Sequence, residues 1–192
     1  MNKDTYFYCG IAGGMAAAIG TICWLIFRPY QHSIGEIVET SQQTNSNTMT
    51  TPIGYDTSVR GYRNNNPLNI RLSSNNWKGE IKPSADKSFC QFQTMAYGFR
   101  AAMVCIRTYI TKHNCNTLQE IINRWAPWTD GNNPLNYAKK VMNTFPDTFP
   151  DKDTVIDYHN QNQMTKLVYA MAIVENGSEP QMTDCIQAFN LI

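Results

Sequence analysis

A run of nineteen residues without a charged side chain constrains this chain more than any other feature. It extends from Cys9 to Phe27 and reads CGIAGGMAAAIGTICWLIF. As a helix it would be about 28 Å long, which matches the hydrocarbon core of a bilayer. Trp24 and Tyr30 lie near its end, where aromatic side chains favour the membrane interface. We therefore predict one transmembrane helix within residues 1–30, with residues 9–27 in contact with lipid.

A cleaved secretory signal peptide is the alternative interpretation of the same run. Lys3 precedes it, and Ala16 to Ala18 contain the A-x-A pattern of a cleavage site. The apolar run continues past these alanines, farther than a usual signal core, and this favours an uncleaved anchor. Because Lys3 lies before the run and Arg28 after it, the positive-inside rule leaves the orientation of the anchor open.

The composition changes twice after the anchor. Residues 31–57 are rich in Ser, Thr, Gln and Asn and lack a sustained apolar period, which is typical of a flexible linker with a reach of roughly 25 to 30 Å. Residues 58–192 are long enough to bury a single core. We predict three parts: an anchor at residues 1–30, a linker at 31–57 and a folded domain at 58–192.

Charge and metal-binding residue types limit the possible partners. The chain has 16 Lys and Arg against 15 Asp and Glu, and a net charge of +1 provides no broad basic surface for nucleic acid. Neither the three histidines nor the six cysteines have the spacing of a metal site, so we expect no metal and no cofactor. Four cysteines follow the linker and could form up to two disulfides, although buried thiols are the commoner outcome: Cys90, Cys105, Cys115 and Cys185.

Hydrophobic periodicity predicts a mainly helical α+β domain with a small sheet. Residues 68–72 and 88–92 resemble short strands. Helices are expected where apolar residues recur at helical spacing or where a cap is encoded, as in the capping box that starts at Thr117. The expected helices cover residues 94–112, 117–125, 133–142, 164–176 and 180–189.

Two segments far apart in the chain are predicted to form one site. Tyr62 to Ile70 is dense in asparagine, whose amides both donate and accept hydrogen bonds and so suit a ligand rich in hydroxyls and amides. Glu175 ends an apolar helical run and precedes Asn-Gly, at a helix terminus where a negative charge is unfavourable. That unfavourable placement indicates a function for the carboxylate.

The same segments carry a resemblance to a known family. Residues 60–71 (RGYRNNNPLNIR) and 77–79 (WKG) resemble the opening of small phage virion proteins assigned to the lysozyme-like, peptidoglycan-cleaving superfamily. Residues 89–102 resemble their strand and G-x-R-A helix, residues 121–127 their I-I-x-R-W-A-P turn, and residues 174–177 the E-N-G near their C-terminus. The resemblance covers most of the predicted domain and implies a lysozyme-like fold with a glycan groove.

The resemblance also implies a set of site residues. Glu175 is similar to the Glu of the Glu-Ser-Gly motif in lytic transglycosylases and would be the catalytic acid. Bacterial glucosaminidases place a Glu shortly before their Asn-rich segment, and this chain does not. The expected substrate-binding residues are Asn64, Asn65, Asn66, Asn69, Tyr62, Tyr97, Trp125 and Trp128. Each of these residues has a structural alternative. Glu175 would then be a helix-end carboxylate, the asparagines would form a self-bonded turn, and the aromatic residues would be buried core side chains.

A single carboxylate favours one kind of glycan cleavage. Hydrolysis normally uses two carboxylates, whereas a lytic transglycosylase lets the sugar's own 6-hydroxyl attack and needs one. We therefore expect a membrane-anchored, virion-associated enzyme that cleaves bacterial peptidoglycan during phage entry, located in a virion membrane or a host envelope, with other virion proteins as further partners. The alternative is a non-catalytic structural or glycan-binding virion protein that keeps the fold.

Overall fold

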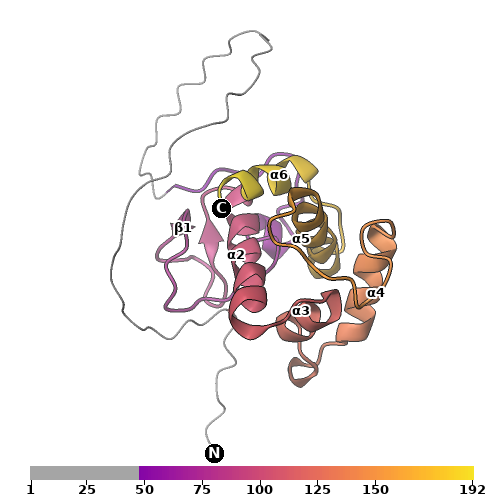
Figure 1. The fold of residues 1–192 in the computed structure, drawn as a ribbon. Coiled ribbons are helices and arrows are strands. Elements are labelled where there is room, and N and C mark those ends of the chain that lie inside the picture. The colour runs from indigo at the N-terminus through magenta and orange to yellow at the C-terminus, as the bar shows by residue number, and fades with distance from the viewer. Residues whose placement is uncertain (1–47) are drawn as a thin grey trace, which may run out of the picture. The chain divides into compact units, whose positions relative to one another are not determined.

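The computed structural model describes residues 48–192, and the predicted anchor and most of the predicted linker lie outside this range. The described part is mainly helical with a two-stranded sheet, as predicted (Figure 1). Its elements are α1 (Arg60–Arg63), β1 (Glu80–Ile81), β2 (Gln91–Phe92), α2 (Met95–His113), α3 (Leu118–Trp125), a 3-10 turn η1 (Trp128–Asp130), α4 (Pro134–Thr144), α5 (Gln161–Asn176) and α6 (Met182–Asn190). Within residues 48–192, no helix is both long enough and apolar enough to cross a bilayer.

Helices α2 and α5 contribute more residues to the buried core than the other helices do. Thr94 caps α2 by accepting a hydrogen bond from the backbone N–H of Tyr97, and the helix ends at Asn114 in the left-handed region. Helix α5 begins after Asn160 and ends at Gly177, where φ is 73°. Helix α6 packs against both, and α4 packs against α5. The prediction of a left-handed stop after Asn176 is confirmed.

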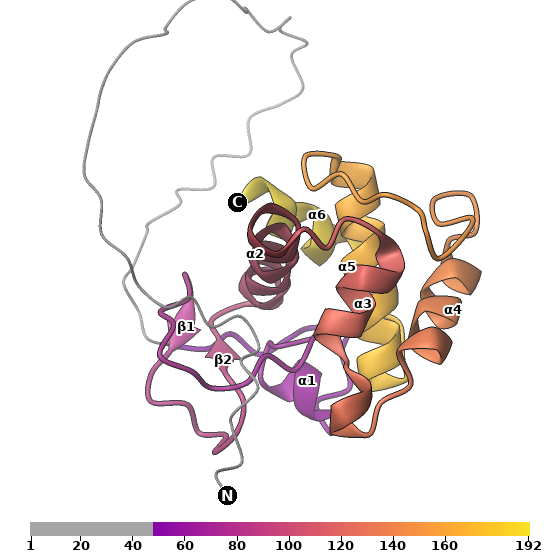
Figure 2. The same ribbon diagram turned by 60° about the horizontal axis from the view of Figure 1, so that its bottom comes forward.

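Local capping chemistry fixes helices α3 and α4, which pack against each other, with α4 also against α5 (Figure 2). Thr117 and Glu120 form the predicted capping box of α3. Asn133 accepts a hydrogen bond from the backbone N–H of Asn136, and Pro134 occupies the first turn of α4. These starts are confirmed, because each depends on residues within one helical turn. Helix α6 begins at Met182, two residues later than predicted.

The predicted strand at residues 68–72 is wrong. Strand β2 pairs antiparallel with β1, so that Glu80 lies opposite Phe92, and residues 68–72 contribute one isolated bridge between Arg71 and Phe89. Asn69 has a φ of 50°, and the Asn66 side chain accepts a hydrogen bond from the Ile70 N–H. A left-handed residue and a side-chain-closed turn prevent this segment from extending.

The end of the predicted linker packs against the domain. The Tyr55 hydroxyl donates to Asp184 Oδ2 at 2.6 Å and accepts from the Gln181 N–H at 2.9 Å. The Gln181 side chain donates to the Ile53 carbonyl at 2.8 Å, and the Thr50 N–H donates to the carbonyl of Gln93 at 2.8 Å. Residues 50–55 are therefore joined to α6 and to the end of the sheet.

Replacement of Gly98 should reverse the usual effect of alanine in a helix. A Cβ at this position in α2 would collide with the Asn65 carbonyl oxygen and lie 2.8 Å from Pro67 Cδ. We expect Gly98→Ala to lower the free energy of unfolding by about 1 to 3 kcal/mol, although the same change in an open helix raises it by about 0.5 to 1 kcal/mol. Urea unfolding of the full-length chain in non-ionic detergent measures the difference.

Gly131→Ala is the control for this experiment. Gly131, unlike Gly98, has a positive φ, of 79°, and beyond its chain neighbours no atom lies within 4 Å of the place that a Cβ would take. Gly131→Ala should lower the free energy of unfolding by about 1 kcal/mol, from backbone strain alone. A Gly98→Ala chain as stable as the wild type would contradict the close packing of α2 on the asparagine-rich segment at residues 62–70, which we call the asparagine loop.

Candidate active site

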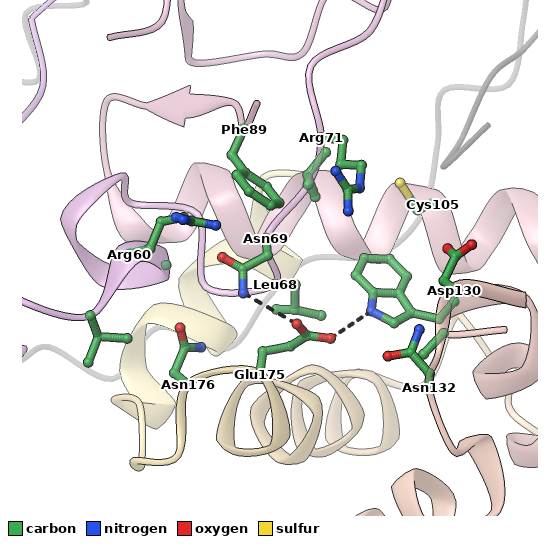
Figure 3. Close-up of a pocket in the computed structure, with 15 residues that line it drawn as sticks. Arg60, Leu68, Asn69, Arg71, Phe89, Cys105, Asp130, Asn132, Glu175 and Asn176 are labelled. Carbon is green, nitrogen blue, oxygen red and sulfur yellow. Dashed lines mark hydrogen bonds between the residues drawn. The ribbon is translucent and has the colours of Figure 1, made fainter. Parts of the chain in front are cut away.

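A pocket of about 380 Å³ lies where the asparagine loop, the end of α3 and the end of α5 meet. We call it the Glu175 pocket. Figure 3 shows Glu175 reaching from α5 towards Asn69, with Phe89 beyond Asn69 and with Asp130 and Asn132 on the opposite side of Glu175 from Asn69. Polar groups from distant parts of the chain therefore surround one carboxylate.

Three donors from three different elements hold that carboxylate. Glu175 Oε1 accepts from the Trp125 indole N–H at 3.2 Å and from the Tyr137 hydroxyl at 3.0 Å. Glu175 Oε2 accepts from Asn69 Nδ2 at 3.3 Å. The donors belong to α3, α4 and the asparagine loop, so the structure brings together the two segments that the sequence analysis paired.

The environment of Glu175 favours its protonated form. Burial raises the pKa of this carboxyl above its ordinary value, and the hydrogen bonds from Asn69, Trp125 and Tyr137 act in the opposite direction and are weaker. Its place in the last turn of α5 adds the unfavourable end of the helix dipole. A raised pKa is what a general acid requires near neutral pH.

The hydrogen bonds also distinguish the two oxygens of the Glu175 carboxyl group. Oε1 faces the Trp125 N–H and the Tyr137 hydroxyl, which also lies 3.3 Å from the Met171 carbonyl oxygen, whereas Oε2 faces Asn69 alone, so Oε2 is the less crowded place for an acidic hydrogen. The Asn69 amide oxygen is buried and has no hydrogen-bond partner among the described residues. A half-turn of that amide would place an acceptor at Oε2. Asn69 can therefore match either protonation state of Glu175.

The other asparagines of the loop lie outside the lining of the Glu175 pocket, and their role in substrate binding stays a prediction. Asn64, Asn65 and Asn66 are buried. Asn66 donates to the carbonyls of Ile70 and Cys90, each at 2.9 Å. Asn65 donates to the carbonyls of Thr50, Phe92 and Gln93. Asn64 binds side chains beside the sheet. Their amides hold the loop in shape.

The four aromatic residues predicted to contact substrate lie in different surroundings. Trp125 lines the Glu175 pocket, whereas Tyr62 is buried and donates to the Ser178 carbonyl at 2.7 Å. The Tyr97 ring lies against Gly79, and Trp128 is 57% exposed outside the pocket lining. Tyr62, Tyr97 and Trp128 therefore lie outside the lining of this pocket, and their substrate contacts stay predictions.

Comparison with known proteins gives one relationship. No family model matches the sequence. Protein P5 of Pseudoalteromonas phage PM2 is 34% identical over 139 residues, which are 71% of this chain and 82% of that protein. The chain belongs to the protein P5 family.

Several pocket residues of this protein P5 relative were missed from the sequence. Tyr137 was expected only as a buried helix residue, yet its hydroxyl reaches a carboxylate 38 positions away. Asp130 brings a second carboxylate to the pocket lining, which corrects the expectation of a single acid. Arg60 and Arg71 both lie over the Phe89 ring, with guanidinium carbons 4.9 and 5.2 Å from its centroid. Only the tertiary fold makes these residues neighbours.

Other reactive groups of this P5-family chain lie away from the Glu175 pocket or are placed without metal-binding geometry. Among residues 48–192, no group of three or more His, Cys, Asp or Glu could hold a metal ion. None of the four described cysteines forms a disulfide there. The Glu80 side chain is only 2% exposed, pairs with Lys82 at 3.2 Å and accepts from the Trp77 N–H. It serves the hairpin and not the pocket.

Glu175 should make stability fall as pH rises. Because its folded pKa lies above its ordinary value of about 4.3, the folded state holds more protons than the unfolded state between the two values, and the free energy of unfolding decreases with pH there. Glu175→Gln removes this dependence and keeps an acceptor for Trp125 and Tyr137. Urea unfolding at several pH values should show the variant gaining stability relative to the wild type as pH increases. A constant difference would contradict the raised pKa.

Proposed function

We propose that this chain is a membrane-anchored, virion-associated enzyme that cleaves the glycan backbone of peptidoglycan, as a lytic transglycosylase or muramidase with a lysozyme-like domain. The observation that carries the proposal is the Glu175 carboxyl, which sits in a pocket, has a raised pKa and faces the asparagine loop. The apolar run at residues 9–27 and the relationship to a phage protein support the membrane and virion parts of the proposal.

Glu175 Oε2 is the atom suited to proton donation. In the first step its proton passes to the glycosidic oxygen as the bond from that oxygen to C1 breaks. In a transglycosylase the 6-hydroxyl of the same sugar then bonds to C1, and its proton returns to the Glu175 carboxylate, which leaves a 1,6-anhydro end. Trp125 and Tyr137 stabilise the carboxylate in that interval by donating to Oε1.

Asp130 gives hydrolysis a structural basis as well. It lines the same pocket and lies on the opposite side of Glu175 from Asn69 (Figure 3). Hydrolysis needs a second carboxylate that orients a water molecule or attacks the sugar. Asp130 is the residue that would fill this role, and the two reactions leave different chain ends.

A non-catalytic, glycan-binding protein is the second candidate. This candidate is favoured by a structural role of Glu175, because its carboxylate accepts hydrogen bonds from the asparagine loop, α3 and α4. Such a bridge stabilises the fold without turnover. The two functions differ in what Glu175→Gln does, because the amide can keep most of the bridge but cannot donate a proton as an acid.

Mass spectrometry of fragments released from purified peptidoglycan tests the proposal. We expect the full-length wild type to release fragments with anhydro ends or reducing ends, and Glu175→Gln to lose at least about a hundredfold in rate. Asp130→Asn is the matched variant: it should retain activity if the ends are anhydro and lose it if they are reducing. If the folded wild type binds the wall and releases no fragments, the enzyme proposal fails and the glycan-binding function stands.

Tyr137→Phe should shift the pH dependence of cleavage. The Tyr137 hydroxyl bond lowers the pKa of Glu175, so its removal raises that pKa further and extends activity to higher pH. The stability cost should be about 1 kcal/mol, because one partly buried hydrogen bond is lost. Tyr158→Phe, which removes a hydroxyl outside the pocket lining, is the control. An unchanged alkaline limit in Tyr137→Phe would show that another group sets it.

A further inference from the structure

A second pocket, of about 460 Å³, runs along α4 beside the Glu175 pocket. Its lining includes four asparagines between residues 132 and 143, together with Tyr137, Val174 and the consecutive lysines Lys139 and Lys140. We call it the lysine pocket. No acidic side chain contributes to its lining, so its surface is positive and rich in amide groups.

The lysine pocket borders the Glu175 pocket. Asn132 lines both. Tyr137 lines the lysine pocket while its hydroxyl lies 3.0 Å from Glu175 Oε1, and Val174 precedes Glu175 in α5. A branched ligand bound at Glu175 could therefore extend a branch past Asn132 towards the lysine pocket.

The charges of the lysine pocket are available to such a branch. Lys139 and Lys140 are both exposed, and within residues 48–192 neither lies within 4.0 Å of a carboxylate oxygen in a salt bridge. The side chains of Asn136 and Asn143 are also exposed on the same helix. Ammonium donors beside amides suit a ligand that carries both carboxylates and peptide groups.

We propose that the lysine pocket binds the peptide stem of peptidoglycan, with Lys139 and Lys140 contacting its carboxylates. This inference rests on the proposed function, since the glycan in the Glu175 pocket would bring the stem to α4. Peptidoglycan offers the required chemistry, because the lactyl group of every second sugar carries a short peptide with free carboxylates. The pocket would thus make the protein select glycan that still bears its peptides.

Binding measurements on the full-length chain in non-ionic detergent test this proposal. The test variant is Lys139→Gln with Lys140→Gln, and the control is Lys78→Gln with Lys87→Gln, which changes the charge equally at exposed positions outside both pockets. All chains also carry Glu175→Gln, so that no ligand is cleaved. The three ligands are a peptide-bearing glycan fragment, the same fragment after amidase has removed its peptides, and the free stem peptide.

We expect the test variant to bind the peptide-bearing fragment about three- to tenfold more weakly than the control does, with a smaller difference at high salt. Binding of the peptide-free fragment should be the same in both. The free peptide should shift the NMR side-chain amide signals of Asn136 and Asn143. Equal binding of the peptide-bearing fragment by both variants, or equal weakening for both fragments, would overturn the proposal.

The same experiment separates this proposal from the proposed function. If the chain with Glu175 intact cleaves wall glycan but the lysine substitutions change no binding constant, the enzyme stands and the peptide site fails. If it never cleaves glycan while the peptide still binds through Lys139 and Lys140, the peptide site stands and the enzyme fails. Urea unfolding midpoints of the two lysine variants should agree, because the substituted side chains are exposed.

Discussion

The Glu175 carboxylate lies where a negative charge is unfavourable, and several elements of the described domain meet at it. Glu175 is removed from water at the unfavourable end of a helix dipole, and three neutral donors only partly offset that cost. Each donor comes from a separate element, and the farthest, Asn69, lies 106 positions away in the chain. The site is therefore assembled only when the asparagine loop, α3, α4 and α5 are all in place, and its chemistry is a property of the whole fold.

The asparagine side chains of the asparagine loop have different roles. Buried Asn65 and Asn66 satisfy backbone groups that no sheet reaches, which lets the loop remain inside the domain without a strand. Their amide nitrogens are used in that task. Asn69, held in the left-handed region, is the residue whose side chain is turned towards the pocket. A short loop thus provides both a rigid frame and one adaptable polar group.

Local signals made the helices predictable, whereas the pocket depended on distant contacts. The starts of α3 and α4 and the stop of α5 follow from caps within a turn, at Thr117, Asn133 and Gly177. Pairing Glu175 with the asparagine loop also succeeded, because each segment looked unusual on its own. The strand at residues 68–72 failed because side-chain bonding overrode β propensity, and Tyr137 could not be placed because an amphipathic pattern does not show which polar tip will meet a carboxylate.

The two oxygens of the Glu175 carboxyl group are inequivalent, because Oε1 faces two donors and Oε2 faces one. The side of Asn69 is therefore the less crowded side for a proton. A glycan strand has a chemical direction, since each bridging oxygen joins different carbons on its two sugars. Under the proposed function, this inequivalence would favour productive binding of a strand in one polarity.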